Sequence, residues 1–243
     1  MLKIHSIETF WTHEWPGIRF ILFLQWCNFQ CLYCHNADTI PLSKKWENIS
    51  QKEVLEKIEN SKIYFGKKWW ITISGGECLL QAKDLLPFLK ELKNRWFHIV
   101  IDTNWGILND DVKKLLEYVD LVLLDIKQID DEKHKKLTWK SNKTTLKFLD
   151  YLEKINKKYW IRYVLVPWYT DDKNDIEKMW KYLEKYKFLE KIEILPYHTL
   201  WVFKWKEIWI KYKLDWVNPP SEQSKNQTKK ILEKYIKNVF VRG

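Results

Sequence analysis

The sequence predicts an α/β fold, a partial (βα)6 barrel of the TIM type in which parallel strands are surrounded by outer helices. Six short apolar runs alternate with amphipathic segments of helical period. Polar residues follow these runs at their carboxyl ends, where parallel barrels keep their active sites. No repeat or linker divides the 243 residues, so we expect a single domain. A doubly wound open sheet is the alternative.

The expected elements alternate in order along the chain. A near-continuous apolar run at residues 18–24 predicts the first strand, and Ser50 with Glu53 predicts a capping box that opens a helix ending near residue 61. Further strands are expected at residues 71–74, 98–102, 121–125, 160–166 and 191–196. Helices are expected at residues 82–95, 110–118, 173–186 and 222–237, and more than one helix is expected within residues 130–157. The core barrel would then cover about residues 16–200, with a C-terminal helical extension over about residues 201–243.

Composition and charge narrow the class of protein. Charged residues make up 30% of the chain, and no apolar stretch approaches the length of a membrane span. The net charge of +10 suits nucleic acid or an acidic partner, but the lysines are scattered along helices and no nucleic-acid-binding motif accompanies them. We therefore expect neither a nucleic-acid nor a membrane partner. Residues 1–30 contain no export leader, which predicts a cytoplasmic protein.

The most specific motif is the C-x3-C-x2-C spacing of Cys27, Cys31 and Cys34. It offers three thiolates to a four-iron cubane and leaves one iron open to bind and cleave a small molecule. Three alternatives compete. C-x-x-C-H at residues 31–35 fits a c-type haem, which requires export. Zinc would need His35 as fourth ligand, directly after Cys34, and a disulfide is rare in the cytosol.

Polar residues at the ends of the apolar runs suit a small polar ligand. The glycines leave backbone groups open to an amino-acid moiety, and the carboxylates suit an ammonium, ribose hydroxyls or a hard cation. The basic side chains suit a carboxylate or a peptide backbone, while Tyr33 and His35 suit a purine ring. The residues at or after strand ends are Gly75, Gly76, Glu77, Asp102, Thr103, Asp125, Lys127 and His198, and Arg162 lies within the strand expected at residues 160–166.

Together these motifs resemble the radical S-adenosylmethionine superfamily. The resemblance starts from the cysteine spacing, with Tyr33 before the last cysteine, and from the Gly-Gly-Glu run at residues 75–77. Within the superfamily the chain is similar to the family that activates pyruvate formate-lyase. The matching segments extend from Ile4 to Pro220 and include residues 16–20, 31–36, 74–77, 102–104, 124–128, 160–163 and 195–198.

The resemblance implies an oxidoreductase with two cofactors. A [4Fe-4S] cluster held by Cys27, Cys31 and Cys34 would bind S-adenosylmethionine at its open iron. Reductive cleavage of that cofactor would give methionine and a 5′-deoxyadenosyl radical, which would take an α-hydrogen from a glycine of pyruvate formate-lyase. Flavodoxin or ferredoxin is the implied reductant, and we expect a monomer.

The resemblance also assigns roles to the strand-end residues. His35 would pack on the adenine, and His198 would lie near the cofactor's carboxylate. Asp102, Thr103 and Asp125 match a site for Na⁺ or K⁺. The positions implied for cofactor or peptide contacts are Gly75, Gly76, Glu77, Asp102, Lys127 and Arg162. Cys78 stands where the family has a small residue, and we interpret it as a buried structural thiol.

Two other functions remain open from the sequence. Activators of other glycyl radical enzymes commonly carry a cysteine-rich insert after the first motif, and residues 36–68 contain no cysteine. This favours the short type that acts on pyruvate formate-lyase. A non-catalytic, metal-bearing nucleic-acid module would suit the positive charge, and it predicts basic residues gathered on one face.

The tryptophans are anomalous. The chain has 16 Trp and 6 Gly, whereas Gly makes up about 7% of ordinary proteins. Trp160 and Trp205 match tryptophan in the family. The other 14 stand where the family has glycine: Trp11, Trp15, Trp26, Trp46, Trp69, Trp70, Trp96, Trp105, Trp139, Trp168, Trp180, Trp201, Trp209 and Trp216. Glycine at those positions would restore a share of roughly 8%. We hypothesise that the gene comes from a lineage that reads UGA as glycine.

Overall fold

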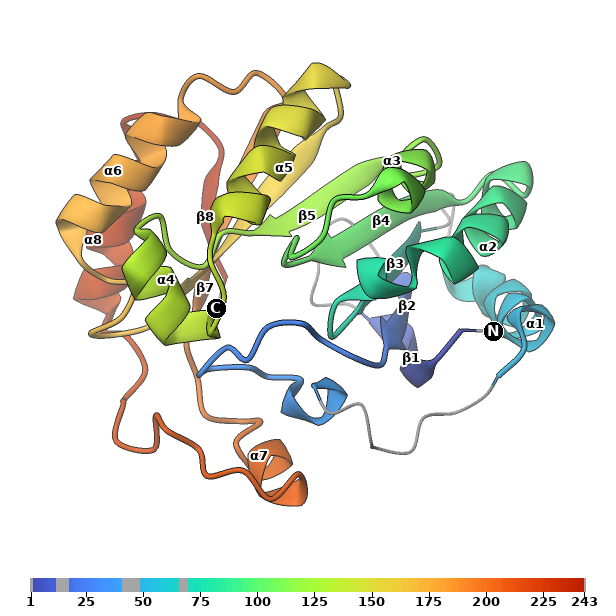
Figure 1. The fold of residues 1–243 in the computed structure, drawn as a ribbon, viewed down its shortest axis with the longest axis horizontal. Coiled ribbons are helices and arrows are strands. Elements are labelled where there is room, and N and C mark those ends of the chain that lie inside the picture. The colour runs from blue at the N-terminus through green and yellow to red at the C-terminus, as the bar shows by residue number, and fades with distance from the viewer. Residues whose placement is uncertain (1, 12–17, 41–48, 66–69, 243) are drawn as a thin grey trace. The chain divides into compact units, whose positions relative to one another are not determined.

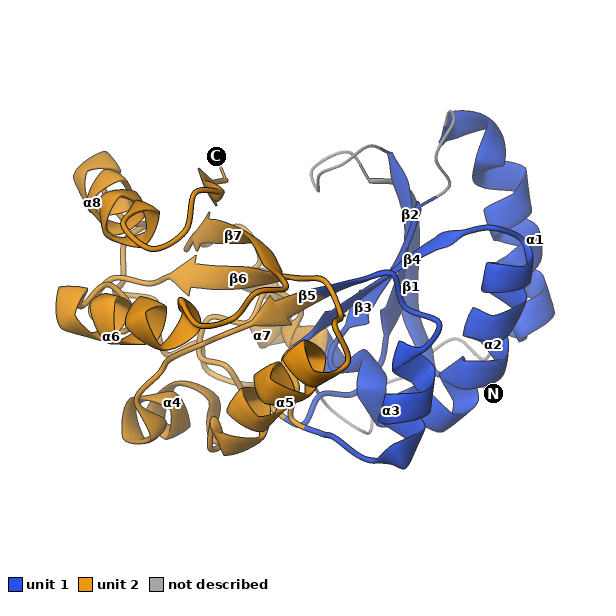
Figure 2. Cartoon of the chain, turned by 90° about the horizontal axis from the view of Figure 1, so that it is seen from above, with its two compact units in different colours: residues 1–28, 39–103, 107–122 blue, residues 29–38, 104–106, 123–243 orange. Residues whose placement is uncertain are grey.

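The structure is a computed structural model that describes residues 2–11, 18–40, 49–65 and 70–242, and it divides into two compact units (Figures 1 and 2). Unit 1 comprises Met1–Asn28, Thr39–Thr103 and Ile107–Val122. Unit 2 comprises Phe29–Asp38, Asn104–Gly106 and Leu123–Gly243. Of the tryptophans at expected glycine positions, Trp15, Trp46 and Trp69 lie outside the described residues.

Unit 1 is built on parallel strands in chain order. They are β2 (Arg19–Leu24), β3 (Trp70–Gly75) and β4 (His98–Thr103), preceded by β1 (Ile4–Trp11), which pairs antiparallel with β2. Leu24 stands opposite Gly75 at the carboxyl ends of β2 and β3. Strand β5 (Leu121–Asp125) begins in unit 1 and ends in unit 2.

The helices of unit 1 lie on one side of its strands (Figure 2). They are α1 (Gln51–Ser61), α2 (Ala82–Asn94) and α3 (Asp110–Leu116), with short 3-10 turns η2 (Lys62–Tyr64) and η3 (Cys78–Gln81). A third such turn, η1 (Ala37–Thr39), has its first two residues in unit 2 and its last in unit 1. The predicted capping box is confirmed, because the Ser50 hydroxyl accepts from the Glu53 amide and the Glu53 carboxylate accepts from the Ser50 amide. The exposed start of α1 therefore has two of its orphan donors satisfied.

Unit 2 continues the alternation of strands and helices. Its strands are β6 (Tyr159–Leu165), β7 (Leu189–Pro196) and β8 (Val239–Val241), which pair parallel in that order. Its helices are α4 (Asp131–Thr138), α5 (Lys143–Lys154), α6 (Lys173–Leu183), α7 (Phe203–Glu207) and α8 (Glu222–Glu233). Helix α8 lies beside α6 (Figure 1).

The predicted α/β class is confirmed, with a parallel sheet that is not closed. Two strands escaped prediction. Strand β1 carries polar side chains at His5, Ser6 and Glu8 and pairs at an edge, and β8 is three residues long. The last helix, expected over residues 222–237, ends at Glu233 because the chain then turns into β8. Across the described residues, no helix combines the length and the apolar character that crossing a bilayer requires.

Apolar side chains in register build the core of each unit. Phe20 of β2 stands opposite Ile71 of β3, and Ile71 opposite Ile99 of β4, all fully buried. In unit 2, Ile161 of β6 and Ile192 of β7 are paired and buried in the same way. Each such side chain contributes roughly 1.5–3 kcal/mol when it leaves water. The strand ends that carry polar residues are therefore fixed by packed strands.

Left-handed backbone is concentrated at tryptophans. Among the described residues, positive φ occurs at seven non-glycine residues, and six of them are tryptophan: Trp26, Trp96, Trp105, Trp139, Trp168 and Trp209. The seventh is Asn156, a type that tolerates this region, whereas for a bulky residue positive φ is an outlier. All six belong to the set for which the sequence predicts glycine.

Candidate active site

The glycine pair at residues 75–76 forms a tight crossing in unit 1. Gly75 ends β3 at φ +117, and a Cβ there would lie 2.2 Å from the Leu24 carbonyl oxygen. A Cβ on Gly76 would lie 2.2 Å from the carbonyl oxygen of Trp26, the residue before Cys27. The Glu77 amide donates to that same carbonyl at 2.7 Å. The side-chain-poor strand end thus holds the backbone that leads into the cysteine motif.

Substituting Gly76 tests this crossing. The variant Gly76→Ala is expected to lose about 3 kcal/mol or more of stability, because the methyl group would overlap main-chain atoms that cannot move aside. Urea unfolding of the full chain measures the loss. Glu56→Ala on the exposed face of α1 is the control, with an expected change within about 0.5 kcal/mol. Equal stability of the two variants would contradict the tight crossing.

Glu77 is a fully buried carboxylate at this strand end. Its oxygens accept hydrogen bonds from the Thr103 hydroxyl at 2.7 and 2.8 Å and from the Leu79 amide at 3.0 Å. Next to it, the Asp102 carboxylate accepts from the Ser74 hydroxyl at 2.8 Å. The structure therefore brings together in unit 1 the predicted residues from the ends of β3 and β4.

Cys78 belongs to the same corner of unit 1. It is fully buried, and its thiol lies 3.5 Å from the Asp102 carbonyl oxygen. Burial, together with the nearby charges of Glu77 and Asp102, raises the pKa of the Cys78 thiol well above its usual value. A thiol of this kind stays protonated and inert, as expected of a structural cysteine.

In unit 2 the other two cysteines of the motif lie on one turn. The Cys34 amide donates to the Cys31 carbonyl at 3.1 Å, which folds the chain back between them. The preceding backbone is held by α4, because the amides of Gln30 and Leu32 donate to the carbonyls of Thr138 and Leu137 at 3.0 Å. This cysteine turn, residues 31–34, is thus anchored by the last residues of a helix that is distant in sequence.

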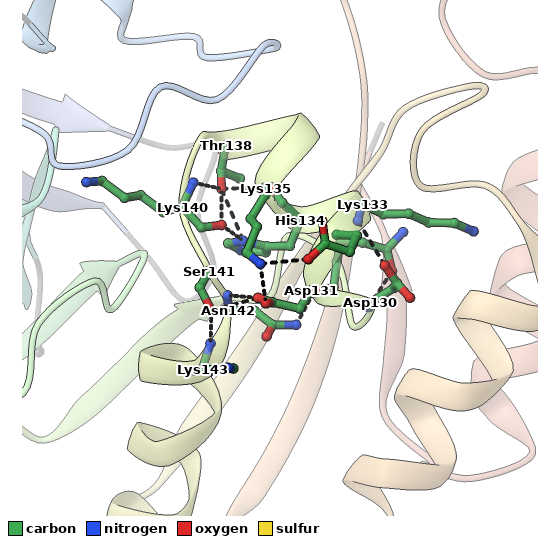
Figure 3. Close-up of polar contacts among 12 residues, drawn as sticks. Asp130, Asp131, Lys133, His134, Lys135, Thr138, Lys140, Ser141, Asn142 and Lys143 are labelled. Carbon is green, nitrogen blue, oxygen red and sulfur yellow. Dashed lines mark hydrogen bonds and ion pairs between the residues drawn. The ribbon is translucent and has the colours of Figure 1, made fainter.

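A side-chain network fixes the end of that helix, as Figure 3 shows. The Thr138 hydroxyl donates to the His134 carbonyl at 2.9 Å, and His134 Nδ1 lies 2.6 Å from the Lys140 carbonyl oxygen. At the other end of α4, Asp131 accepts from the Ser141 hydroxyl at 2.7 Å. The His134 ring also meets Phe29 edge to face at 5.6 Å. The carbonyls that hold the cysteine turn are therefore fixed in place by this network.

Helix α7 holds the other side of the cysteine turn. The Trp205 indole N–H donates to the Cys34 carbonyl at 3.0 Å, and this tryptophan is 6% exposed. Beside it, Lys204 reaches the Asp38 carboxylate at 3.3 Å and the Asn36 amide oxygen at 3.4 Å. Sequence reasoning missed both Trp205 and Lys204 as site residues; their only signal was that Trp205 matched tryptophan in the family.

A buried cation stands beside the cysteine turn. Lys127, after the end of β5, pairs with Asp125 at 2.7 Å and lies 5.5 Å from the centre of the Tyr33 ring. Burial alone would lower the pKa of Lys127, but Asp125, Tyr33 and Cys31 raise it well above its usual value, so the ammonium keeps its charge. Burial raises the pKa of Cys31 to about 12, and Lys127 opposes that rise.

Two histidines of unit 2 stack face to face. The rings of His35 and His198 are 4.1 Å apart at an interplanar angle of 27°. Burial, and secondarily the neighbouring His198 and Lys127, lower the pKa of His35 to about 3, so its ring is neutral. Arg162 in β6 adds positive charge to the same surroundings. The structure thus gathers in unit 2 the predicted residues that follow β5 and β7, together with Arg162 inside β6.

The donor set fits an iron–sulfur cluster and a polar cofactor. None of the four cysteines forms a disulfide, and thiolates are the ligands that such clusters take. In the described part of the chain, the buried Tyr33 hydroxyl and His35 Nε2 have no hydrogen-bond partner, as expected of groups that await a ligand. Within neither unit do described residues gather three or more metal-binding side chains. Cys27 belongs to unit 1, whereas Cys31 and Cys34 belong to unit 2.

Known proteins resemble this chain over most of its length. The model of the radical SAM superfamily matches residues 21–183. The chain is 43% identical over 233 residues to the pyruvate formate-lyase-activating enzyme of Staphylococcus epidermidis, covering 92% of this chain and 93% of that protein. It is 39% identical over 237 residues to the enzyme of that name from Listeria monocytogenes, covering 95% and 96%.

The fold has a counterpart among solved structures. A domain of the pyruvate-formate lyase-activating enzyme from Bacteroides vulgatus is similar with a TM-score of 0.60 at 25% identity. That likeness covers 71% of this chain and 98% of the solved domain.

Proposed function

The chain belongs to the radical S-adenosylmethionine superfamily and, within it, to the pyruvate formate-lyase-activating enzymes, and from this we propose that it installs the glycyl radical on pyruvate formate-lyase. The observation that carries the proposal is the identity of 39–43% to two such enzymes over more than nine tenths of the chain. The cysteine turn beside Lys127 and the His35–His198 stack support it.

Family membership implies a [4Fe-4S] cluster and S-adenosylmethionine, and we assign the cluster to Cys27, Cys31 and Cys34. When bound, the pair supplies the 5′-deoxyadenosyl radical that takes a hydrogen atom from the target glycine. Lys127 favours the thiolate forms of Cys31 and Cys34 and offers its charge to the cofactor's carboxylate.

The remaining predicted residues receive roles in holding the cofactor. Glu77 is a buried acceptor for the cofactor's ammonium, oriented by Thr103. His35, neutral and flat against His198, and Tyr33 offer apolar surface to the adenine. Gly75, Gly76, Asp102 and Arg162 are assigned to cofactor or peptide contacts. The burial of Glu77 and Tyr33 would also exclude water from a reactive radical.

The proposed function also includes a monovalent cation and an external electron donor. A monovalent cation, Na⁺ or K⁺, is assigned to Asp102, Thr103 and Asp125, whose hard oxygen ligands suit it. Flavodoxin or ferredoxin supplies the electron, and the protein acts as a monomer in the cytoplasm, where its thiols stay reduced.

Radical formation on the partner tests the function. The full chain, carrying glycine at the 14 anomalous positions, is reconstituted anaerobically with iron and sulfide and mixed with S-adenosylmethionine, a reductant and pyruvate formate-lyase from the same source. A glycyl-radical doublet in the electron paramagnetic resonance spectrum, together with 5′-deoxyadenosine and methionine, is the expected result. Cleavage of the cofactor with a doublet only on another glycyl radical enzyme would reassign the partner. No cleavage at all would overturn the function.

A further inference from the structure

Three of the left-handed tryptophans end helices in the position that glycine normally takes. After α2, the Phe97 amide donates to the Leu92 carbonyl and the Trp96 amide to the Lys93 carbonyl, which is the Schellman pattern. The residue that follows the C-cap in this pattern has left-handed backbone angles and is usually glycine. Trp96 occupies it with φ 65.

The ends of α7 and α4 repeat this arrangement. After α7, the amides of Ile210 and Trp209 donate to the Trp205 and Lys206 carbonyls, and Trp209 has φ 59. After α4, the Trp139 amide donates to the Lys135 carbonyl, and Trp139 has φ 65. Helix α5 shows what the fold accepts besides glycine, because Asn156 takes the equivalent place.

A fourth tryptophan occupies the glycine position of a turn. Val166, Pro167, Trp168 and Tyr169 form a turn in which the Tyr169 amide donates to the Val166 carbonyl at 3.1 Å. Proline in the second place and positive φ in the third, here 71, define a type II turn, whose third residue is glycine or asparagine.

The indoles themselves are poorly accommodated. Trp96, Trp168 and Trp209 are 88%, 80% and 95% exposed. Trp105 is fully buried, with its ring centre 3.0 Å from that of Phe148, well inside the roughly 4.5–7 Å at which aromatic rings pack. Trp180 lies fully buried in α6, and among the described residues its indole nitrogen has no hydrogen-bond partner.

The two tryptophans that match the family behave differently. The Trp160 indole donates to the Glu190 carboxylate at 3.3 Å and the Trp205 indole to the Cys34 carbonyl at 3.0 Å. Neither residue has positive φ. The backbone and the packing therefore separate the six left-handed tryptophans and Trp180 from Trp160 and Trp205, without reference to any relative.

We propose that the native polypeptide carries glycine at the six left-handed positions and at Trp180, because the codons there are read as glycine in the cell of origin. Two of the six adjoin residues of the site: Trp26 precedes Cys27, and Trp139 follows Thr138, whose carbonyl accepts from the Gln30 amide. Trp105 and Trp168 lie in the loops after β4 and β6. Glycine at these positions adopts the left-handed backbone of the loops without steric strain.

The gene and the native protein test this proposal together. UGA is expected at the seven positions and UGG at Trp160 and Trp205, and peptides from the source organism should show, by mass spectrometry, glycine at the seven positions. UGG at the left-handed positions would overturn the proposal. So would UGA codons accompanied by peptide masses that correspond to tryptophan.

A separate observation concerns Trp205. Its indole bond to the Cys34 carbonyl, its contact with Tyr212 at 5.6 Å between ring centres, and the neighbouring Lys204–Asp38 pair fasten the chain after Cys34 from one side. We infer that Trp205 is a positioning residue for the cluster-binding turn, an inference that rests on the proposed function. Fixing the carbonyl of a ligand residue limits the directions in which its thiolate can point.

Substitution of Trp205 by phenylalanine removes the N–H and keeps an aromatic ring. Trp205→Phe in the full native chain is expected to release iron to a chelator about fivefold faster, as loss of one ordinary hydrogen bond predicts, and to alter the resonance line shape of the reduced cluster. Trp160→Phe, which also loses an indole hydrogen bond, is the matched control and should leave both unchanged.

The outcomes separate this inference from the proposed function. Equal iron release and an unchanged line shape in Trp205→Phe and Trp160→Phe would overturn the role of Trp205 while leaving the function intact. Failure of the unsubstituted protein to bind a cluster would overturn the function, and the role of Trp205 with it.

Discussion

Replacing the six left-handed tryptophans by glycine is expected to raise the free energy of unfolding by on the order of 5 kcal/mol in total. Left-handed backbone costs each non-glycine residue about 1–2 kcal/mol. The greater entropy of glycine in the unfolded chain reduces this gain by about 0.5–1 kcal/mol per residue. A typical domain has a stability of only about 5–15 kcal/mol. The tryptophan form should therefore fold marginally, and denaturant unfolding of both forms measures the difference. At the fully buried Trp105, relief of the 3.0 Å contact between its ring centre and that of Phe148 offsets the loss of a buried indole.

Tryptophans outside the set provide the matched control. Trp160→Gly and Trp205→Gly each remove a buried, hydrogen-bonded indole and are expected to lose about 3–5 kcal/mol. The signs of the two experiments are thus opposite. A loss of stability on replacing the six together, or a gain at Trp160 or Trp205, would contradict the division of the tryptophans into two kinds.

Removing a thiol from the cysteine turn is expected to abolish activity. Cys31→Ala or Cys34→Ala would leave two thiolates for a cluster that needs three from the protein, so bound iron and 5′-deoxyadenosine formation should fall to background. Iron analysis, visible absorbance and product chromatography after anaerobic reconstitution measure these quantities. Cys27→Ala is expected to behave in the same way.

Cys78 is the control for this experiment because the proposed ligand set does not include it. Cys78→Ala should bind iron normally and lose about 1 kcal/mol of stability, since its thiol fills a buried corner of unit 1. Full activity in Cys31→Ala or Cys34→Ala, or loss of the cluster in Cys78→Ala, would refute the assignment of ligands.

The fold was predictable wherever the chain is apolar on its buried side. The runs that became β2 to β7 are nearly continuous in branched and aromatic residues, and Ser50 with Glu53 marked the start of α1. Strand β1 was not predictable because polar residues such as His5, Ser6 and Glu8 interrupt its apolar run, although its partner β2 is the next strand in the chain. Strand β8 offers three residues, too few for a pattern.

Within the site, residue types were predictable but partners were not. The parallel strands predicted that polar residues at the ends of β3 and β4 would converge on one face, but not that Glu77 would accept from Thr103. The pairing of Lys127 with Asp125 leaves no pattern in the sequence. The bond from Trp205 to Cys34 joins residues 171 apart, and it depends on the course of the chain after β7, which no local propensity determines.

Because of the Trp205–Cys34 hydrogen bond, the fluorescence of Trp205 should report whether the cluster is bound. With glycine at the 14 anomalous positions, Trp160 and Trp205 are the remaining tryptophans, and the Trp205 indole donates to the carbonyl of Cys34, a proposed cluster ligand. Iron–sulfur centres absorb in the near ultraviolet, where indoles emit, so the emission of Trp205 should dim as the cluster assembles. Cluster loading and loss can then be followed by intrinsic fluorescence in a sealed cuvette, with no added label.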